Sequence, residues 1–371
     1  MNILVTGASG FVGKNLCSQL HNLGYEVFKY DKSDTLETLS AYTKSCDFVV
    51  HLAGVNRPTN PEDFFSGNRG FTETLCDLLH QHNNKAPIAI SSSIQAELDN
   101  DYGVSKREGE SILLDHSRKN NSEVYIYRFS NLFGKWCKPF YNSVVATWCH
   151  SIARGEDIQI NNENAELTLE YIDDVVNELV RCINGKPNFK NVEERLCSVP
   201  INEKVTLGEL AKLIQSFKAS RTSLLIPNMG DEFTKKLYST YLSYLPTDEF
   251  SYNLNSHVDN RGSFTEILKT IDRGQVSLNI SKPGITKGQH WHHTKNEKFL
   301  VVSGQGKIQF RDIFSQEIIE YEVTGDILQV VDIPVGYTHN IINTGENDLI
   351  TIMWVNEIFD QDNPDTYYLE V

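Results

Sequence analysis

The sequence predicts an α/β domain with a doubly wound parallel sheet, followed by a smaller all-β barrel. Up to about residue 217, short apolar runs alternate with segments whose apolar residues recur at helical spacing, as in a parallel sheet covered by helices. From Tyr252 onward, short strands alternate with turns rich in Gly and Asn, as in a barrel. At 371 residues the chain is too long for one core. We therefore expect two domains, residues 1–246 and 247–371.

The elements of the first domain follow one another in chain order. The expected strands are Asn2–Thr6, Glu26–Tyr30, Phe48–Leu52, Ile88–Ile90, Val124–Phe129 and Arg195–Val199. The expected helices lie around Thr72–His82, Lys106–His116, Tyr171–Ile183 and Thr206–Phe217. Ligands of open α/β sheets bind at the carboxyl ends of the strands. The residues that follow these strands are therefore the first candidates for a cofactor site.

A glycine-rich turn follows the first strand. Gly7, Gly10 and Gly13 are each separated by two residues, and Phe11 and Val12 open the helix that follows. Such a turn lets backbone N–H groups approach a pyrophosphate, and the helix N-terminus adds partial positive charge to the same place. These five residues predict a dinucleotide-binding site.

Residues after the second and third strands extend this site. Asp31 stands where an acidic side chain meets the ribose 2′-OH of NAD, and Lys32 directly after it could neutralise the 2′-phosphate of NADP. The two residues leave the choice of cofactor open. Leu52, Ala53 and Gly54 follow the third strand, and we expect them to line the same cofactor site.

A second group of residues predicts carbonyl reduction. Tyr102 and Lys106 are four positions apart, so they lie on one face of a helix, and the ammonium can lower the pKa of a phenol from about 10. Tyr102 is then a proton donor. A serine of the run Ser91–Ser93 would hydrogen-bond the same carbonyl oxygen as hydride arrives from a nicotinamide.

The strongest pattern of the second domain lies between Gly284 and Gly304. His290 and His292 share one face of a strand because strand side chains alternate, Glu297 returns on the next strand, and His339 follows downstream. Three nitrogens and one carboxylate suit zinc, iron, manganese or nickel better than calcium or magnesium. We predict a metal site formed by these four side chains, with Zn²⁺ as the preferred ion.

The motifs of the first domain resemble those of the extended short-chain dehydrogenase/reductases that act on nucleotide sugars. The resemblance covers about residues 1–245 and includes the segments Arg128–Gly134 and Tyr171–Val175. It implies an NADP-binding Rossmann-type fold, with Ser93 as the catalytic hydroxyl and Ser92 as the alternative.

The same resemblance implies roles for further residues. Tyr102 would be the acid, and Lys106 its partner that also touches the nicotinamide ribose. Ser93 and Asn131 would contact the substrate. An Arg that the family often carries is replaced within Glu166–Glu170. The cations that can take its place at the substrate diphosphate are Arg128, Lys135, Lys138 and Arg154, of which we assign Arg128.

The histidine segments of the second domain resemble the two motifs of the cupin barrels. Asp259–Glu266 resembles the entry segment of nucleotide-sugar epimerases built on that barrel. Those enzymes move a proton beside a ketone, so a base is required. Lys287 and His293 are nearest in sequence, but strict alternation places both on the strand face opposite His290. We take Lys287 as the candidate. Whether the metal is catalytic or structural stays open.

The whole arrangement resembles the bifunctional enzymes of bacterial capsular-polysaccharide synthesis. It implies that the cupin epimerises C3 of a UDP-4-keto-6-deoxy-hexosamine and that the first domain then reduces C4 with NADPH. The product would be UDP-2-acetamido-2,6-dideoxy-L-talose, a precursor of UDP-N-acetyl-L-fucosamine, made by a homodimer. Two alternatives remain. One is an NADP-binding regulatory protein without turnover, and the other is a reductase fused to an iron-dependent cupin oxygenase.

Composition excludes several other classes. Lys and Arg number 34 against 49 Asp and Glu, and the net charge of -15 opposes nonspecific binding to nucleic acid or anionic membrane. The seven cysteines all precede residue 200 and form no Cys-x-x-Cys pair, as expected in a reducing compartment. No apolar run is long enough to span a bilayer. We expect a cytoplasmic protein.

Overall fold

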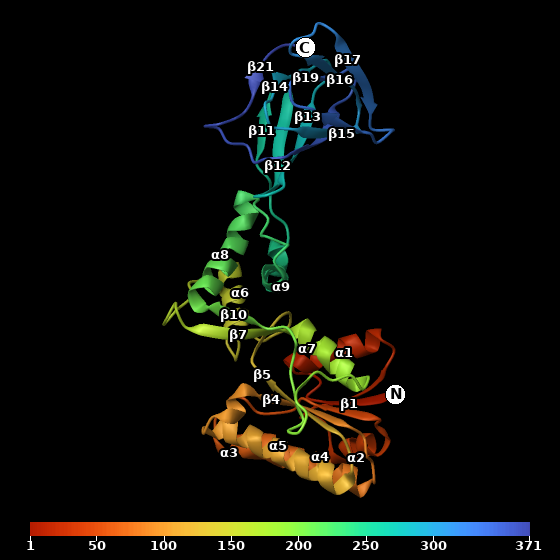
Figure 1. The fold of residues 1–371 in the computed structure, drawn as a ribbon, viewed down its shortest axis with the longest axis vertical. Coiled ribbons are helices and arrows are strands. Elements are labelled where there is room, and N and C mark those ends of the chain that lie inside the picture. Colours follow the sequence, from red (N-terminus) through yellow and green to blue (C-terminus); the bar gives the residue numbers. More distant parts are fainter. The chain divides into compact units, whose positions relative to one another are not determined.

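The computed structural model describes all 371 residues, which form two compact units (Figure 1). One comprises residues 1–215 and 236–246, and the other comprises residues 216–235 and 247–371. The division after residue 246 is the one placed from the sequence. Residues 216–235, which we expected in the first domain, group with the second unit. There Leu225 forms a β-bridge with Lys269, and the Ile226 N–H donates to the Lys269 carbonyl at 2.8 Å.

A seven-stranded sheet forms the centre of the first unit. Its order is β2-β1-β3-β4-β5-β9-β8, and only the β8–β9 pair is antiparallel. The strand order reverses at β1 and β3, where ligands of doubly wound folds bind. The strands are β1 Asn2–Thr6, β2 Glu26–Tyr30, β3 Phe48–His51, β4 Ile88–Ser93, β5 Val124–Phe129, β8 Phe189–Asn191 and β9 Leu196–Cys197.

Helices cover both faces of this sheet and bury its central strands on both sides. Leu16 of α1 and Leu179 of α7 belong to one buried cluster, and Leu39 of α2, Leu75 of α4 and Leu113 of α5 belong to the other. The helices are α1 Phe11–Asn22, α2 Leu36–Ser45, α3 Glu62–Phe64, η1 Phe65–Gly70, α4 Phe71–Gln81, η2 Ile94–Glu97, α5 Asp101–Asn120 and α7 Ile172–Ile183. The predicted fold class of this part is confirmed.

A smaller portion follows β5 and carries a three-stranded sheet of order β10-β7-β6. Strands β6 Asn131–Phe133 and β7 Glu166–Tyr171 run parallel, so Asn131 lies beside Leu169. The remaining elements are β10 Glu203–Thr206, α6 Val144–Arg154, α8 Leu207–Ser223, α9 Glu232–Leu242 and η3 Thr247–Glu249.

The second unit contains two antiparallel sheets, as the predicted barrel requires. Their orders are β11-β12-β13-β20-β15-β18 and β17-β16-β19-β14-β21. Alternating side chains such as Phe299, Val301, Ile308 and Phe310 fill the space between them. The strands are β11 Ser256–Asp259, β12 Gly262–Thr270, β13 Gly274–Ser281, β14 Thr286–Trp291, β15 Glu297–Ser303, β16 Gln305–Asp312, β17 Ile318–Thr324, β18 Val330–Ile333, β19 Tyr337–Asn343, β20 Leu349–Val355 and β21 Tyr367–Tyr368.

Several element boundaries differ from expectation. Strand β4 continues through Ser93 rather than ending at Ile90, and the expected strand Arg195–Val199 is reduced to Leu196–Cys197. The helix around residues 106–116 is longer on both sides and includes Tyr102. None of the helices combines the length and apolar character that crossing a membrane demands.

Candidate functional site

The glycine turn between β1 and α1 is built for close backbone contacts. Gly7 has a φ of +70°, and a Cβ there would lie 2.8 Å from the backbone nitrogen of Ala53. A Cβ at Gly13 would lie 2.2 Å from the Gly7 carbonyl oxygen. Gly10 caps the N-terminus of α1. The turn therefore stands against the end of β3, with the helix N-terminus directed at it, as pyrophosphate binding requires.

The predicted cofactor residues beside the glycine turn differ in exposure. Phe11, Val12 and Leu52 are partly buried and pack against the core. Gly54 is exposed at the end of β3. A Cβ at Gly54 would lie 2.9 Å from Lys106 Nζ, so this glycine leaves room for the lysine beside the cofactor turn.

Asp31 is engaged by the glycine turn itself. Its carboxylate accepts hydrogen bonds from the Ser9 backbone N–H at 2.9 Å and from Ser9 Oγ at 2.8 Å. Asp31 therefore holds the turn in place. Lys32 is exposed and makes no ion pair. Its ammonium is the positive charge next to Asp31, where the sequence left the choice between NAD and NADP open.

Ser93, Tyr102 and Lys106 come together at the carboxyl end of β4. Ser93 caps η2 and hydrogen-bonds Tyr102 through their side chains. Lys106 is buried, donates to the Ser91 carbonyl at 3.1 Å, and places Nζ 5.9 Å from the centre of the Tyr102 ring. Burial lowers the pKa of Lys106 to about 8, although Glu110 acts in the opposite direction.

The expected lowering of the Tyr102 pKa is not found in this structure. Burial raises the pKa of this phenol, and the hydrogen bond with Ser93 only partly offsets that effect. The ammonium of Lys106 has its hydrogen bond to Ser91 rather than to the phenol oxygen, which explains why it does not act as we expected. A raised pKa keeps Tyr102 protonated at neutral pH, which is the form that a proton donor needs.

An ion pair between partly buried Arg128 and buried Glu110 lies behind these residues. Glu110 follows Lys106 by one helical turn. Its two carboxylate oxygens accept hydrogen bonds from the Arg128 guanidinium at 2.9 and 2.6 Å. Ser92 donates to the same carboxylate, so it is less available for catalysis than Ser93. Arg128 also contacts Glu97 at 3.3 Å. These bonds place Arg128 in a structural network, which offers another role than the predicted contact with substrate.

Asn131 lies at the start of β6 with an exposed side chain. Its amide donates to the Thr168 carbonyl at 3.2 Å, which fixes the side chain between β6 and β7. Glu170 lies nearby on β7 and accepts from the Ser130 N–H at 3.3 Å. Burial raises the pKa of Glu170 to about 7.

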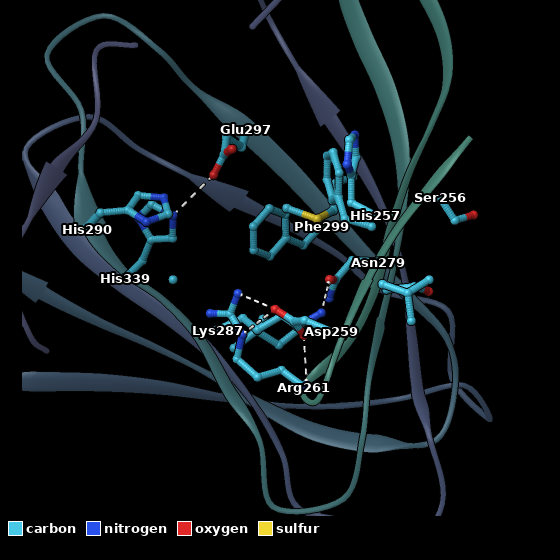
Figure 2. A pocket seen from close by; sticks show the side chains of 16 residues that line it. Ser256, His257, Asp259, Arg261, Asn279, Lys287, His290, Glu297, Phe299 and His339 are labelled. Atoms are coloured by element: carbon cyan, nitrogen blue, oxygen red, sulfur yellow. Dashed lines mark hydrogen bonds and ion pairs between the residues drawn. The ribbon is translucent and has the colours of Figure 1, made fainter. Parts of the chain in front are cut away.

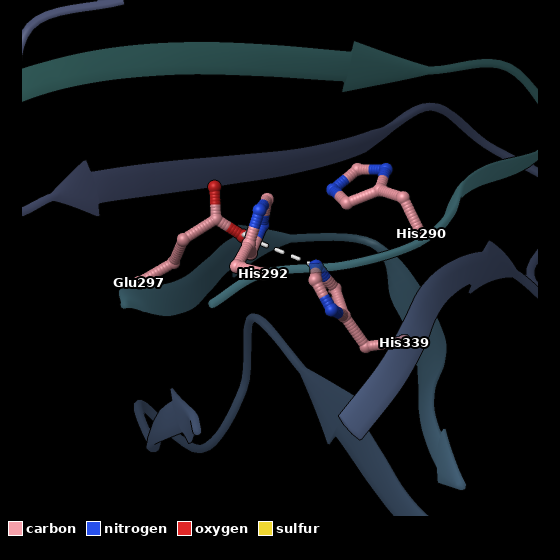
Figure 3. Close-up of side chains that lie close together, drawn as sticks. All are labelled: His290, His292, Glu297 and His339. Atoms are coloured by element: carbon pink, nitrogen blue, oxygen red, sulfur yellow. Dashed lines mark hydrogen bonds and ion pairs between the residues drawn. The ribbon is translucent and has the colours of Figure 1, made fainter. Parts of the chain in front are cut away.

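The four predicted metal ligands converge in the second unit (Figure 3). His290 and His292 come from β14 and the turn after it, Glu297 opens β15, and His339 comes from β19. One ligand atom from each lies within 4.8 Å of all the others. His339 Nε2 lies 3.1 Å and His292 Nε2 lies 3.7 Å from Glu297 Oε2.

The chemistry of this cluster fits a divalent transition metal. His292 is buried, yet its Nε2 has no hydrogen-bond partner in the protein. Burial lowers the pKa of His290 to about 4, so the ring is neutral and its lone pair is free. Burial acts to raise the pKa of Glu297, but contacts with His292 and His339 outweigh it and lower the pKa to about 2. Three imidazole rings with one carboxylate match zinc ligation.

Lys287 faces the same cavity as the metal ligands, which corrects the expectation from strand alternation. Strand β14 carries a bulge between Gly288 and His290, where φ is +105° at Gly288 and +62° at Gln289. The extra residue returns Lys287 to the face of His290. A Cβ at residue 288 would lie 2.7 Å from the His339 carbonyl oxygen, so the bulge needs glycine there.

The cavity has a volume of about 560 Å³ and is lined by both groups of residues (Figure 2). His290, Glu297 and His339 lie on one side, and Lys287 lies by the Asp259–Arg261 hairpin. Lys287 Nζ donates to Asn279 Oδ1 and to the Ile280 carbonyl, both at 2.8 Å. Burial lowers the pKa of Lys287.

His293, the other candidate base, does not line this cavity. It is exposed, and its ring packs between Trp291 and Tyr367 at centroid distances of 4.5 and 5.0 Å.

Sequence reasoning missed two further residues, Glu110 and Asp365. Glu110 had a signal, since it follows Lys106 by four positions. Asp365, which binds the turn after His292, had none, because it lies 73 residues away along the chain.

Comparison with known families divides the chain in the same order. Residues 3–192 match the NAD dependent epimerase/dehydratase family. Residues 257–367 match the polysaccharide biosynthesis C-terminal domain. The first match includes the glycine turn, Tyr102 and Lys106, and the second includes all four residues of the metal cluster.

Individual relatives match over the full length. The chain is 45% identical to UDP-2-acetamido-2,6-beta-L-arabino-hexul-4-ose reductase of Pseudomonas aeruginosa, over 100% of this chain and 99% of that protein. It is 56% identical to the crystal structure of capsular polysaccharide assembling protein CapF from Staphylococcus aureus, with a TM-score of 0.94 and 100% of both chains covered. UDP-glucose 4-epimerase from Thermotoga maritima is 20% identical, with a TM-score of 0.52 over 59% of this chain and 83% of the epimerase. At that identity the similarity shows the fold alone.

The ion pair between Arg128 and Glu110 predicts that Arg128→Ala destabilises the protein. The substitution leaves the buried Glu110 carboxylate with its hydrogen bond from Ser92 but without its charged partner, which costs about 3–5 kcal/mol. Urea denaturation measures the change. Arg118→Ala, which removes an exposed pair with Asp115, should change the free energy of unfolding by less than about 0.5 kcal/mol. Unchanged stability with a raised KM for the nucleotide sugar would instead assign Arg128 to substrate binding.

Proposed function

We propose a two-step reaction on a UDP-linked 4-keto sugar for this chain, which belongs to the NAD dependent epimerase/dehydratase family. The second unit epimerises C3 of a UDP-4-keto-6-deoxy-hexosamine, and the first unit then reduces the C4 ketone. The full-length relative is named as a reductase of a hexul-4-ose, a sugar with its ketone at C4. The chain is thus an enzyme of UDP-sugar metabolism in capsular polysaccharide synthesis, and the steps and product are our finer proposal.

The observation that carries this proposal is the presence of two sets of catalytic side chains in two separate units. Ser93, Tyr102 and Lys106 meet at the end of β4 in the first unit. Lys287 and the metal cluster share one cavity of about 560 Å³ in the second. A single-step reductase has no use for the second set. A ketone that first acidifies a neighbouring C–H and then accepts hydride uses both.

In the second unit, Lys287 is the group that moves the proton. A zinc ion held by His290, His292, Glu297 and His339 would polarise the C4 oxygen and make the C3 proton more acidic. The lowered pKa of Lys287 raises the fraction of neutral amine that can take this proton. Asn279 Oδ1 and the Ile280 carbonyl accept from Nζ and hold the side chain toward the cavity.

In the first unit, Tyr102 gives the proton that completes ketone reduction. A bound nicotinamide dinucleotide would supply hydride to C4. Ser93, which hydrogen-bonds Tyr102, can donate to the same carbonyl oxygen and align it. Because Tyr102 stays protonated at neutral pH, it can transfer its proton as negative charge develops on that oxygen.

The chemistry fixes the order of the two steps. Reduction converts the ketone to an alcohol, and the C3 proton then loses the carbonyl that makes it acidic. Epimerisation must therefore come first. The proposed product is UDP-2-acetamido-2,6-dideoxy-L-talose, which would lead to UDP-N-acetyl-L-fucosamine.

NADPH is the proposed reductant. Asp31 already accepts both Ser9 donors, so it serves the glycine turn. Lys32 is exposed beside it and free of ion pairs, and a 2′-phosphate would supply the anion that it lacks. We further propose a homodimer on the resemblance stated above.

Two variants should separate the activities. Tyr102→Phe should lower ketone reduction by at least about 100-fold, because the proton donor is lost. It should keep solvent deuterium exchange at C3. His290→Ala should lose exchange but keep NADPH binding. NMR of the UDP-4-keto sugar in D₂O follows both reactions. Mixing the two variants should restore the final product, whereas loss of both activities in each variant would refute two independent sites.

Replacing Lys287 should stop epimerisation without removing the metal. Lys287→Met is expected to slow C3 exchange about 10²–10⁴-fold, the usual contribution of a general base, with zinc content unchanged. The exchange rate of the wild-type protein should rise with pH and level off below 10.5, the ordinary lysine value, because the neutral amine is the active form. Lys282→Met, at an exposed neighbouring position, is the control. Wild-type exchange in Lys287→Met would exclude this base.

The cofactor choice predicts an effect of Lys32. Lys32→Ala should raise the KM for NADPH about 10-fold and leave that for NADH nearly unchanged, because only NADPH carries the phosphate that the ammonium meets. Lys32→Arg should restore most of the affinity. Steady-state kinetics with both cofactors provide the measurement, with Lys44→Ala as a charge-matched exposed control. An equal effect on both cofactors would contradict the assignment.

A further inference from the structure

The segment after residue 359 lies against the strand that carries the histidine ligands. Strand β21 pairs with β14, with Tyr368 opposite His290 and Tyr367 opposite Trp291. The Leu369 N–H donates to the Gln289 carbonyl at 3.0 Å. The C-terminal segment thus extends the sheet on the side where the first two ligands lie.

Asp365 stands at the entry of this segment and collects an unusual number of hydrogen bonds. Its Oδ2 accepts from the backbone N–H groups of Thr294 at 2.8 Å and Lys295 at 2.9 Å, and from Thr294 Oγ1 at 3.0 Å. Its Oδ1 accepts from the His293 N–H at 3.0 Å. Desolvation acts to raise the pKa of Asp365, but these bonds together outweigh it and hold the pKa well below its usual range. One carboxylate therefore fixes three consecutive residues of the turn between His292 and Glu297.

The main chain at Asp365 acts on the ligand itself. Its carbonyl oxygen lies 2.6 Å from His292 Nδ1. A carbonyl can only accept, so Nδ1 carries the proton and Nε2 carries the lone pair. Nε2 is the atom that is buried, lacks a partner and points to the metal cluster.

A second buried contact anchors the same turn. Lys295 is buried, and its ammonium donates to the Pro364 carbonyl and lies 3.8 Å from Glu357. Lys295 Nζ also donates to Thr366 Oγ1 at 3.4 Å, so the residues on both sides of Asp365 are tied to the turn that presents the ligands. Asp365 and Lys295 do not line the cavity where Lys287 lies.

We propose that Asp365 is a positioning residue of the metal centre. Its carboxylate holds the 293–295 turn while its carbonyl sets the tautomer and orientation of His292, so the last part of the chain belongs to the metal site. Groups that orient a ligand in this way typically contribute 10–100-fold to metal affinity. This inference rests on the proposed zinc centre and deepens it.

Asp365→Asn tests the proposal. Residue 365 has a φ of +39°, which Asn adopts as readily as Asp, so the backbone is not strained. The amide offers one oxygen in place of two and turns an NH₂ group toward backbone N–H donors. Asp362→Asn makes the same change at an exposed position of the same segment.

Zinc affinity of the full-length variants is measured by competition with a chromogenic chelator. Asp365→Asn should bind Zn²⁺ about 10–100-fold more weakly than wild type, and Asp362→Asn should match wild type. The visible spectrum of the Co²⁺-substituted protein should change only in Asp365→Asn, because the coordination geometry is altered. Circular dichroism of the chelator-treated variants should be alike.

The remaining outcomes overturn the proposal in distinguishable ways. Equal Zn²⁺ affinity in both variants would show that Asp365 does not position the ligand. An Asp365→Asn protein that unfolds without metal while Asp362→Asn stays folded would assign Asp365 to folding alone. If the wild-type protein binds no Zn²⁺, the metal centre of the proposed function itself fails, independently of Asp365.

Discussion

The left-handed backbone at Gly288 and Gln289 is the constraint on which the site in the second unit depends. Without this bulge, strict alternation would direct Lys287 away from the cavity that His290 enters. Only glycine fits at residue 288, because the chain there passes against the His339 main chain. One local irregularity thus brings Lys287 and His290 to the same cavity, which Glu297 and His339 enter from other strands.

The first unit relies on a comparable arrangement behind its reactive residues. Buried Glu110 and partly buried Arg128 form an ion pair that ties α5 to β5, and Ser92 joins it from β4. This pair occupies one serine of the run and leaves Ser93 to the hydroxyl of Tyr102. Breaking an ion pair of this kind costs stability, but forming it adds little net attraction because both charges lose their water. The pair therefore serves mainly to fix geometry.

Much of this structure could be predicted because its signals are local. The bounds of β1, β2 and β5 follow directly from short apolar runs, and the metal cluster follows from the spacing of histidines. Where prediction was wrong, the cause was a contact or an irregularity outside the local pattern. The face of Lys287 depended on a bulge that Gly288 could have suggested. The pKa of Tyr102 depended on burial, which no spacing reports. Asp365 depended on contacts across 73 positions.

The distance between His292 and Asp365 along the chain also has a consequence during biosynthesis. A ribosome makes the histidines first and must add 73 more residues before Asp365 exists. Until that segment leaves the exit tunnel, the His292 ring has no carbonyl to set its tautomer. For the proposed zinc centre, we therefore expect weak metal capture by the nascent chain and stable loading only after translation has passed this segment.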